Sequence, residues 1–181
     1  MTPVDSKKKL VMVGWLLCAL IVGGLFYAAF AGESESSTPS KQSREYEGQL
    51  IIFNKKENDG SYPNINCTLP FVSSQVNFQD NSQGCGNDDA YAFKLEEVPS
   101  ATFFTLTDSP DCTETGNFYY RFKTIKHPTT MELPMDIETA GQKAVGSVVV
   151  PGVLLIASTT SGQVGGKLSC VKIERSAVPS P

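Results

Sequence analysis

An uninterrupted apolar run from Leu10 to Ala31 divides the chain and constrains what each part can fold into. The run has no charged residue, and about 20 such residues in a helix cross the ~30 Å hydrocarbon core of a bilayer. Lys7–Lys9 precede it, and the positive-inside rule places such a basic segment in the cytoplasm. We therefore expect residues 1–9 in the cytoplasm, a transmembrane anchor over residues 10–31, and the remainder beyond the membrane.

A cleaved signal peptide is the alternative interpretation of the same run. Ala29-Phe30-Ala31 has the small-x-small pattern that signal peptidase cuts. The apolar core of a signal peptide is usually about 7–15 residues, and this run is longer, with Trp15 and Tyr27 near its two ends. We favour the uncleaved anchor, and both interpretations export the rest of the chain. We expect a single-pass protein of the bacterial inner membrane whose C-terminal part is periplasmic or otherwise extracytoplasmic.

The exported part is predicted to be one domain on a tether. Residues 32–44 (GESESSTPSKQSR) are Ser-rich and polar with one proline, so they cannot bury a core and indicate a flexible linker. Residues 45–175 are long enough for one domain with its own core, and residues 176–181 are expected to be a tail.

The acidic charge of the exported part restricts the classes of partner that it can bind. Of 19 acidic and 15 basic residues in the chain, one acid (Asp5) and three bases (Lys7–Lys9) precede the anchor, which leaves a net charge of −6 beyond it. No basic patch of the kind that binds nucleic acid is visible, and anionic lipid is disfavoured as a direct partner of the domain. A basic protein partner or a divalent cation suits this charge better.

Four of the five cysteines lie in the exported part, which indicates two disulfides. Zinc is the alternative, but no pair has C-x₂-C spacing and His127 is the only histidine. Strands over 91–98 and 102–108, joined at Pro99-Ser100, are predicted to form a hairpin with Cys85 and Cys112 near its open end. We therefore expect the bridges Cys85–Cys112 and Cys67–Cys170.

Short strand-like segments separated by Gly, Pro, Asn and Asp turns fill the domain, and no segment after the anchor has a long helical period. Some of these segments alternate between apolar and polar residues, as half-buried strands do, and others are continuously apolar. This pattern predicts an all-β sandwich or barrel. The predicted strands are 49–54, 71–78, 91–98, 102–108, 118–123, 147–150, 153–158 and 167–174.

Two parts of the domain resemble a known family. Cys85–Ala90 (CGNDDA), with the segments that follow it up to Asp108-Ser109-Pro110, is similar to a Greek-key segment of βγ-crystallin-like domains in bacterial exported proteins, and Gly165–Ile173 resembles the closing strand of that module. The resemblance implies a Greek-key β-sandwich and a Ca²⁺ site at Asn87, Asp88 and Asp89. The chain departs from the family at Tyr91 and Ala92, where the family has hydroxyl ligands, and Ca²⁺ prefers 6–8 oxygens.

No segment of the chain carries a decisive catalytic motif, and we do not expect an enzyme. His127 precedes a proline in a polar stretch, and an exposed loop histidine is its simplest interpretation. Asp88/Asp89 and Asp136/Glu138 are paired carboxylates, which a glycosidase needs on both sides of a cleft. Nothing in the sequence shows that these pairs converge, and a turn is the favoured interpretation of Asp88-Asp89.

The segment 126–142 is the least regular part of the domain. Apolar Met131, Leu133, Met135 and Ile137 alternate in it with polar residues and Pro134, which argues against a central strand. Two interpretations remain open: a Met-containing ridge that binds a partner, or an edge strand packed on the core. The candidate partner-binding residues are Met131, Glu132, Leu133, Met135, Asp136 and Glu138.

Three functions follow from these patterns. The first is a non-enzymatic, membrane-tethered binding domain, most concretely an immunity or inhibitor protein whose acidic loop occludes a toxin or hydrolase. The alternative is a Ca²⁺-stabilised structural module of the cell envelope, in line with the crystallin-like resemblance. The third is an envelope hydrolase that uses paired carboxylates. No cofactor is expected, apart from Ca²⁺ under the second function.

Overall fold

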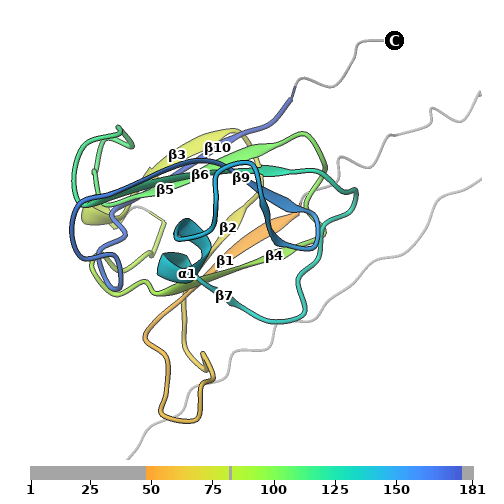
Figure 1. Cartoon of the computed structure of the whole chain (residues 1–181). Helices are drawn as coiled ribbons and strands as arrows, with labels where there is room; N and C mark the ends of the chain where they lie inside the picture. The colour runs from red at the N-terminus through yellow and green to blue at the C-terminus, as the bar shows by residue number, and fades with distance from the viewer. Residues whose placement is uncertain (1–47, 82, 177–181) are drawn as a thin grey trace, which may run out of the picture. The chain divides into compact units, whose positions relative to one another are not determined.

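The computed structural model describes residues 48–81 and 83–176 (Figure 1). The predicted cytoplasmic segment, anchor and linker lie outside the described residues, as do residues 177–181 of the predicted tail. Within the described part of the chain, no helix is long and apolar enough to cross a membrane.

Two antiparallel sheets, with ten strands among the described residues, form a sandwich-like domain whose layers are seen edge-on in Figure 1. This confirms the all-β prediction. The smaller sheet has the order β2 (Ile65–Pro70), β1 (Gln49–Phe53), β4 (Ala92–Glu96), β7 (Met135–Asp136). The larger sheet has the order β3 (Ser74–Asn77), β10 (Cys170–Glu174), β5 (Phe103–Thr107), β6 (Phe118–Thr124), β9 (Val153–Thr160), β8 (Val148–Val150).

Aromatic rings from both sheets meet in the core. Phe93 of β4 is fully buried, and its ring centroid lies 5.5 Å from that of Phe104 in β5 and 5.5 Å from that of Phe122 in β6. Phe104 and Phe122 are stacked 4.9 Å apart on neighbouring strands. Aromatic pairs at such distances contribute about 0.5–1.5 kcal/mol each beyond the area that they bury. These three rings therefore join the two sheets at the centre of the domain.

The outer face of the smaller sheet has an apolar cover of its own. Ile51 and Phe53 of β1 and Ala92 of β4 form a second buried cluster, and Tyr62 of the β1–β2 loop packs against it. The rings of Phe53 and Tyr62 lie 6.5 Å apart. The long loop between β1 and β2 thus folds back over the sheet and brings Tyr62 to its outer face.

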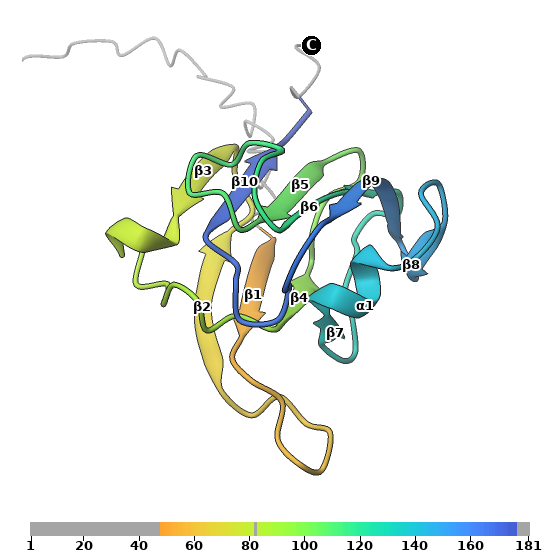
Figure 2. The same ribbon diagram turned by 60° about the vertical axis from the view of Figure 1, so that its left-hand side comes forward.

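Two short helices complete the described residues. The 3₁₀ helix η1 (Phe78–Asp80) follows β3, and the α-helix α1 (Ile137–Gly141) follows β7 and packs against β7 and β9 (Figure 2). Both begin at a capping side chain: Asn77 accepts a hydrogen bond from the Gln79 N–H, and Asp136 accepts one from the Thr139 N–H. Neither helix was expected, because each is too short to show a helical period in the sequence.

The predicted hairpin between residues 91–98 and 102–108 is wrong. Both strands form, as β4 and β5, but β4 lies between β1 and β7, whereas β5 lies between β10 and β6. Residues 97–102 carry the chain from one sheet to the other, with positive φ angles at Glu97 (53°) and Ala101 (58°). The crossover places the rings of Phe93 and Phe104 edge to face across the core, whereas a hairpin would put them on one surface of one sheet.

Two disulfides are present, as predicted, but the expected pairs Cys85–Cys112 and Cys67–Cys170 are wrong. The bridges are Cys67–Cys85, with Cα atoms 5.0 Å apart, and Cys112–Cys170, with Cα atoms 5.3 Å apart. The expected pairing depended on the hairpin, which does not exist. Because β5 pairs with β10, Thr107 lies opposite Cys170, and the connection that follows β5 brings Cys112 to that cysteine.

Candidate functional site

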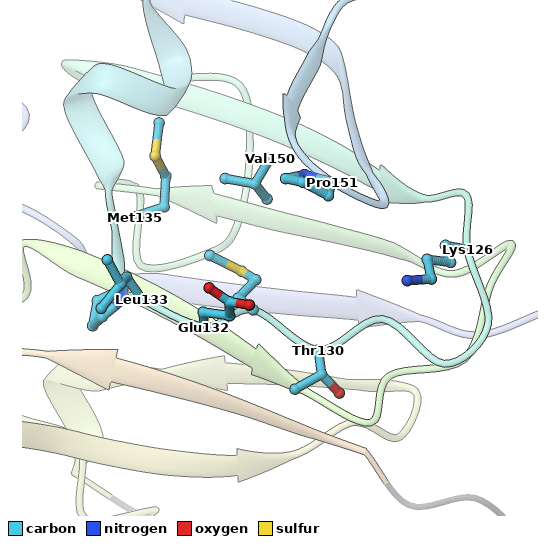
Figure 3. A pocket seen from close by; sticks show the side chains of 9 residues that line it. Lys126, Thr130, Glu132, Leu133, Met135, Val150 and Pro151 are labelled. Atoms are coloured by element: carbon cyan, nitrogen blue, oxygen red, sulfur yellow. The ribbon is translucent and has the colours of Figure 1, made fainter.

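A pocket of about 490 Å³ opens between the edges of the two sheets, on the side of β7 and β8. Figure 3 shows Val150 and Pro151 across the pocket from Glu132 and Leu133, with Lys126 and Leu133 toward its two ends. We call this site the Leu133 pocket. Six of its nine lining residues are apolar; the full set is Lys126, Thr130, Met131, Glu132, Leu133, Pro134, Met135, Val150 and Pro151.

One wall of the Leu133 pocket is an irregular edge strand that runs along β4. Thr129 exchanges two backbone hydrogen bonds with Val98, at 2.8 and 2.9 Å, and the Met131 N–H donates to the Leu95 carbonyl at 2.9 Å. Regular pairing resumes at Met135, opposite Phe93. The intervening residues 132–134 bulge outward, and Pro134 has no N–H to donate to a ladder.

The bulge divides the predicted partner segment into a buried and an exposed part. Met131 is only 5% exposed, and its sulfur accepts the Leu95 N–H at 3.4 Å. Leu133, two residues later, is 77% exposed, which is the largest value among the exposed large apolar side chains of the described residues. Met135 and Val150 are half-buried and pack on the core. The segment is thus an edge strand that also presents one apolar side chain to solvent.

Two opposite charges flank the apolar floor of the Leu133 pocket. Neither Lys126 nor Glu132 forms an ion pair with another of the described residues. Both side chains are exposed, and Figure 3 shows Lys126 reaching from one end of the pocket while the Glu132 carboxylate lies near its centre. The Thr130 hydroxyl at the rim accepts a hydrogen bond from the Glu97 N–H at 3.0 Å. Beside its apolar residues the pocket therefore presents a cationic group at one end and an anionic group near its centre.

Asp136, another candidate partner-binding residue, is engaged in the fold. One carboxylate oxygen accepts the Thr139 N–H at 2.8 Å and caps α1, and the other accepts the Tyr62 hydroxyl at 2.9 Å. Burial, together with this hydrogen bond and the negative charge of Asp136, raises the pKa of the Tyr62 phenol. Glu138 is exposed on α1 and accepts a hydrogen bond from the Gln142 side chain at 3.3 Å. Asp136 therefore anchors the β1–β2 loop to α1.

The candidate Ca²⁺ residues Asn87, Asp88 and Asp89 lie at a turn. Asp88 has a φ of 57°, and one of its carboxylate oxygens lies 3.8 Å from the Lys167 ammonium, which competes with a cation for that oxygen. The side-chain oxygen of Asn87 is buried and has no hydrogen-bond partner among the described residues. In that same part of the chain, no three acidic, histidine or cysteine side chains gather as metal ligands.

His127 is exposed, as expected, in the loop between β6 and Thr129. The pocket residues that were not among the candidates from the sequence are Lys126, Thr130, Pro134, Val150 and Pro151. Pro151-Gly152 lies between the predicted strands 147–150 and 153–158, but no local pattern shows that this turn lies across from Leu133, because that proximity results from the pairing of distant strands.

Comparison of the chain with protein-family models, with curated proteins and with solved structures finds no match. The function has to be argued from the site itself.

Proposed function

We propose that the chain is a non-enzymatic, membrane-tethered binding domain of the bacterial cell envelope that holds a protein partner at the Leu133 pocket. Its most concrete form is an immunity or inhibitor protein, which occludes a toxin or a hydrolase on the extracytoplasmic side of the membrane. The observation that carries this proposal is Leu133, a large apolar side chain that is 77% exposed beside an apolar pocket. Apolar surface of this kind, with a polar rim, is typical of protein–protein interaction sites.

The disulfides support the proposed compartment. Disulfides form and persist in oxidising spaces such as the periplasm, and are rare in the cytosol. Both bridges lie within the part of the chain that follows the predicted anchor. The apolar run 10–31 would hold this domain close to the membrane surface, where an incoming toxin or an envelope hydrolase passes.

The position of the carboxylates supports a binding function over hydrolysis. Asp136 is occupied by a helix cap and by Tyr62, and Asp88 lies near Lys167. A glycosidase needs two carboxyl groups that face each other across a sugar. We also propose that the sandwich is of the Greek-key type, because the order β10-β5-β6-β9 returns the fourth strand beside the first.

Capture of the partner tests the proposal. The full chain with a C-terminal tag is expected to retain a specific envelope or toxin protein from extracts, and Leu133→Asp is expected to lose it. Ile65→Asp is the matched control, because Ile65 is also exposed (55%) but lies on β2, at the opposite edge of the smaller sheet. The captured protein should also lose its toxic or hydrolytic activity when the chain is added. Equal capture by the Leu133→Asp variant, or no effect on that activity, would contradict the proposal.

A further inference from the structure

Both sheets end beside the Leu133 pocket in a strand that is paired on one side only. Within the described residues, β7 is the last strand of the smaller sheet and β8 is the last strand of the larger one, and Figure 2 shows β8 at the outer end of its sheet. Met135 of β7 and Val150 of β8 line the pocket and pack on the core, but each is only half-buried. The pocket is therefore a margin of the core that neither sheet covers with a further strand.

Of these two edges, β8 is the one that is open to a further strand. The chain beside β7 bulges at residues 132–134, and Pro134 has no N–H to donate. Residues 144–153 (AVGSVVVPGV), which contain β8, have no charged residue, although natural edge strands usually carry charges that prevent pairing with another chain. Val148 is 54% exposed, and Val145, just before the strand, is 59% exposed. Pro151 ends the strand, so the open edge is confined to residues 147–150.

An extended segment is the ligand that such an edge fits. The free N–H and C=O groups of an edge strand lie in the plane of the sheet, and another strand pairs with them at a spacing of about 4.8 Å. Added beside β8, that strand would lie over the mouth of the pocket and direct alternate side chains toward Met135 and Val150. A helix pairs its own backbone groups and would leave those of β8 without partners.

The charges around the pocket define this segment further. Because residues 144–153 carry no charge, the middle of the segment should be uncharged, with apolar residues at alternate positions. Lys126, at one end of the pocket, fits an acidic residue at the corresponding end of the segment, whereas Glu132, near the centre of the pocket, disfavours an acidic residue in the middle.

We propose that the partner binds the Leu133 pocket by adding an extended segment, apolar at alternate positions and acidic at one end, as a strand at the free edge of β8. This inference deepens the proposed function and rests on it, because it names the form in which the partner reaches the same pocket. Main-chain hydrogen bonds to β8 supply affinity, and apolar side chains that enter the pocket supply specificity.

Selection of linear peptides tests this mode of binding without the partner. A displayed library of random peptides, about the length of one to two strands, is selected on the full chain in detergent micelles. The enriched peptides should have apolar residues at alternate positions and no proline in the middle. A synthetic copy of an enriched peptide should slow amide hydrogen exchange in residues 147–150 and leave the exchange of β2 unchanged.

Two exposed positions provide a variant and its matched control. Val148→Lys should weaken binding of the enriched peptide about tenfold, because a charge on an edge strand disfavours pairing with another strand. Ile65→Lys should bind the peptide like the wild type, since Ile65 is similarly exposed (55%) but lies on β2, at the opposite edge of the smaller sheet. Both side chains are largely in solvent, so neither change removes a part of the core.

Several outcomes would overturn the inference. These are the absence of enriched peptides, enrichment of apolar residues at the helical spacing of three and four, and slowed exchange away from β8. Slowed exchange in residues 147–150 that grows with the concentration of the chain alone would assign the edge to a second copy and would also overturn it. The proposed function fails separately: if the chain captures a partner but enriches no strand-like peptide, only this inference is wrong, and if the peptide binds β8 but no partner is captured, only the proposed function is wrong.

Discussion

Removing each disulfide separately tests the pairing and the energetic role of each bridge. The Cys67–Cys85 bridge closes a loop with a sequence separation of 18, and the Cys112–Cys170 bridge closes one with a separation of 58. The two loops do not overlap along the chain. Each bridge should therefore restrict the unfolded chain independently, and the two contributions to stability should add.

The loop-entropy model gives the magnitudes. A loop closed over a separation of 18 stabilises the folded state by about 3 kcal/mol, and one closed over 58 stabilises it by about 4 kcal/mol. The paired variant Cys112→Ser/Cys170→Ser should thus lose about 1 kcal/mol more than Cys67→Ser/Cys85→Ser.

Urea unfolding under non-reducing conditions measures this difference, and thiol titration of the unfolded chain tests the pairing. The remaining cysteine of the chain, Cys18, reacts in every variant, so each paired variant should show one free thiol, as the wild type does. Bridges Cys85–Cys112 and Cys67–Cys170 would instead leave two further thiols in each paired variant. Those extra thiols, or a greater loss of stability in Cys67→Ser/Cys85→Ser, would refute the reasoning.

Three further predictions concern the packing beside the pocket. Gly141→Ala places a methyl group against the buried ring of Tyr120 and should lower the free energy of unfolding in urea by about 1–3 kcal/mol. Thr139→Ala, at an exposed position of α1, is the control and should be within about 0.5 kcal/mol of the wild type. Tyr62→Phe removes the hydrogen bond to Asp136 and should cost about 1 kcal/mol at pH 7. Folding raises the pKa of Tyr62, so the stabilisation by this group is complete below the unfolded pKa of about 10 and is lost as the pH rises above it. The free energy of unfolding should therefore fall less steeply between about pH 9 and 11 in Tyr62→Phe than in the wild type. Equal slopes would contradict this assignment. Met131→Ala should cost about 2–5 kcal/mol by leaving a cavity under the pocket and removing the acceptor of the Leu95 N–H, and an unchanged unfolding midpoint would show that the pocket wall is not part of the core.

Local sequence patterns predicted most of the strands, because a strand shows its buried face in its own residues. Tyr91–Val98 contains β4 with Phe93 and Leu95 inside, and the apolar runs at 147–150 and 153–158 correspond to β8 and β9. β2 was missed although Ile65–Pro70 alternates between apolar and polar residues, because the segment is short and ends in a proline. It becomes a strand through pairing with β1, which carries a far stronger apolar pattern.

Strand neighbours could not be predicted in the same way. Pro99-Ser100 looks like the turn of a hairpin, but the two strands lie in different sheets, where Phe93 packs against Phe104 across the core. The disulfide pairing failed with it, because both expected bridges depended on which strands lie side by side. A short apparent turn between two apolar strands therefore predicts the strands but not their pairing.

Part of the candidate site could be predicted from the sequence, because one wall of the pocket departs from the regular alternation of a strand. Pro134 interrupts an alternating segment, and the structure forms a bulge there that exposes Leu133 while keeping Met131 buried. Bulges on edge strands also protect a sheet from pairing with another chain. The opposite wall, Val150-Pro151, belongs to a different sheet, and its approach to Leu133 depends on the whole sandwich.

The two edges of the sandwich differ in what holds the chain together there, and this difference affects where a partner can bind. On the side of β2 and β3, the bridge Cys67–Cys85 ties β2 to the loop that precedes β4. On the side of β7 and β8, the closure depends on the segment 129–136 and on α1, a helix of five residues, with no disulfide among the described residues. Segments held by few contacts open at lower free energy than the core, and binding surfaces are often drawn from such regions. The Leu133 pocket lies on this second side, where a partner can reposition the wall without breaking a covalent bond.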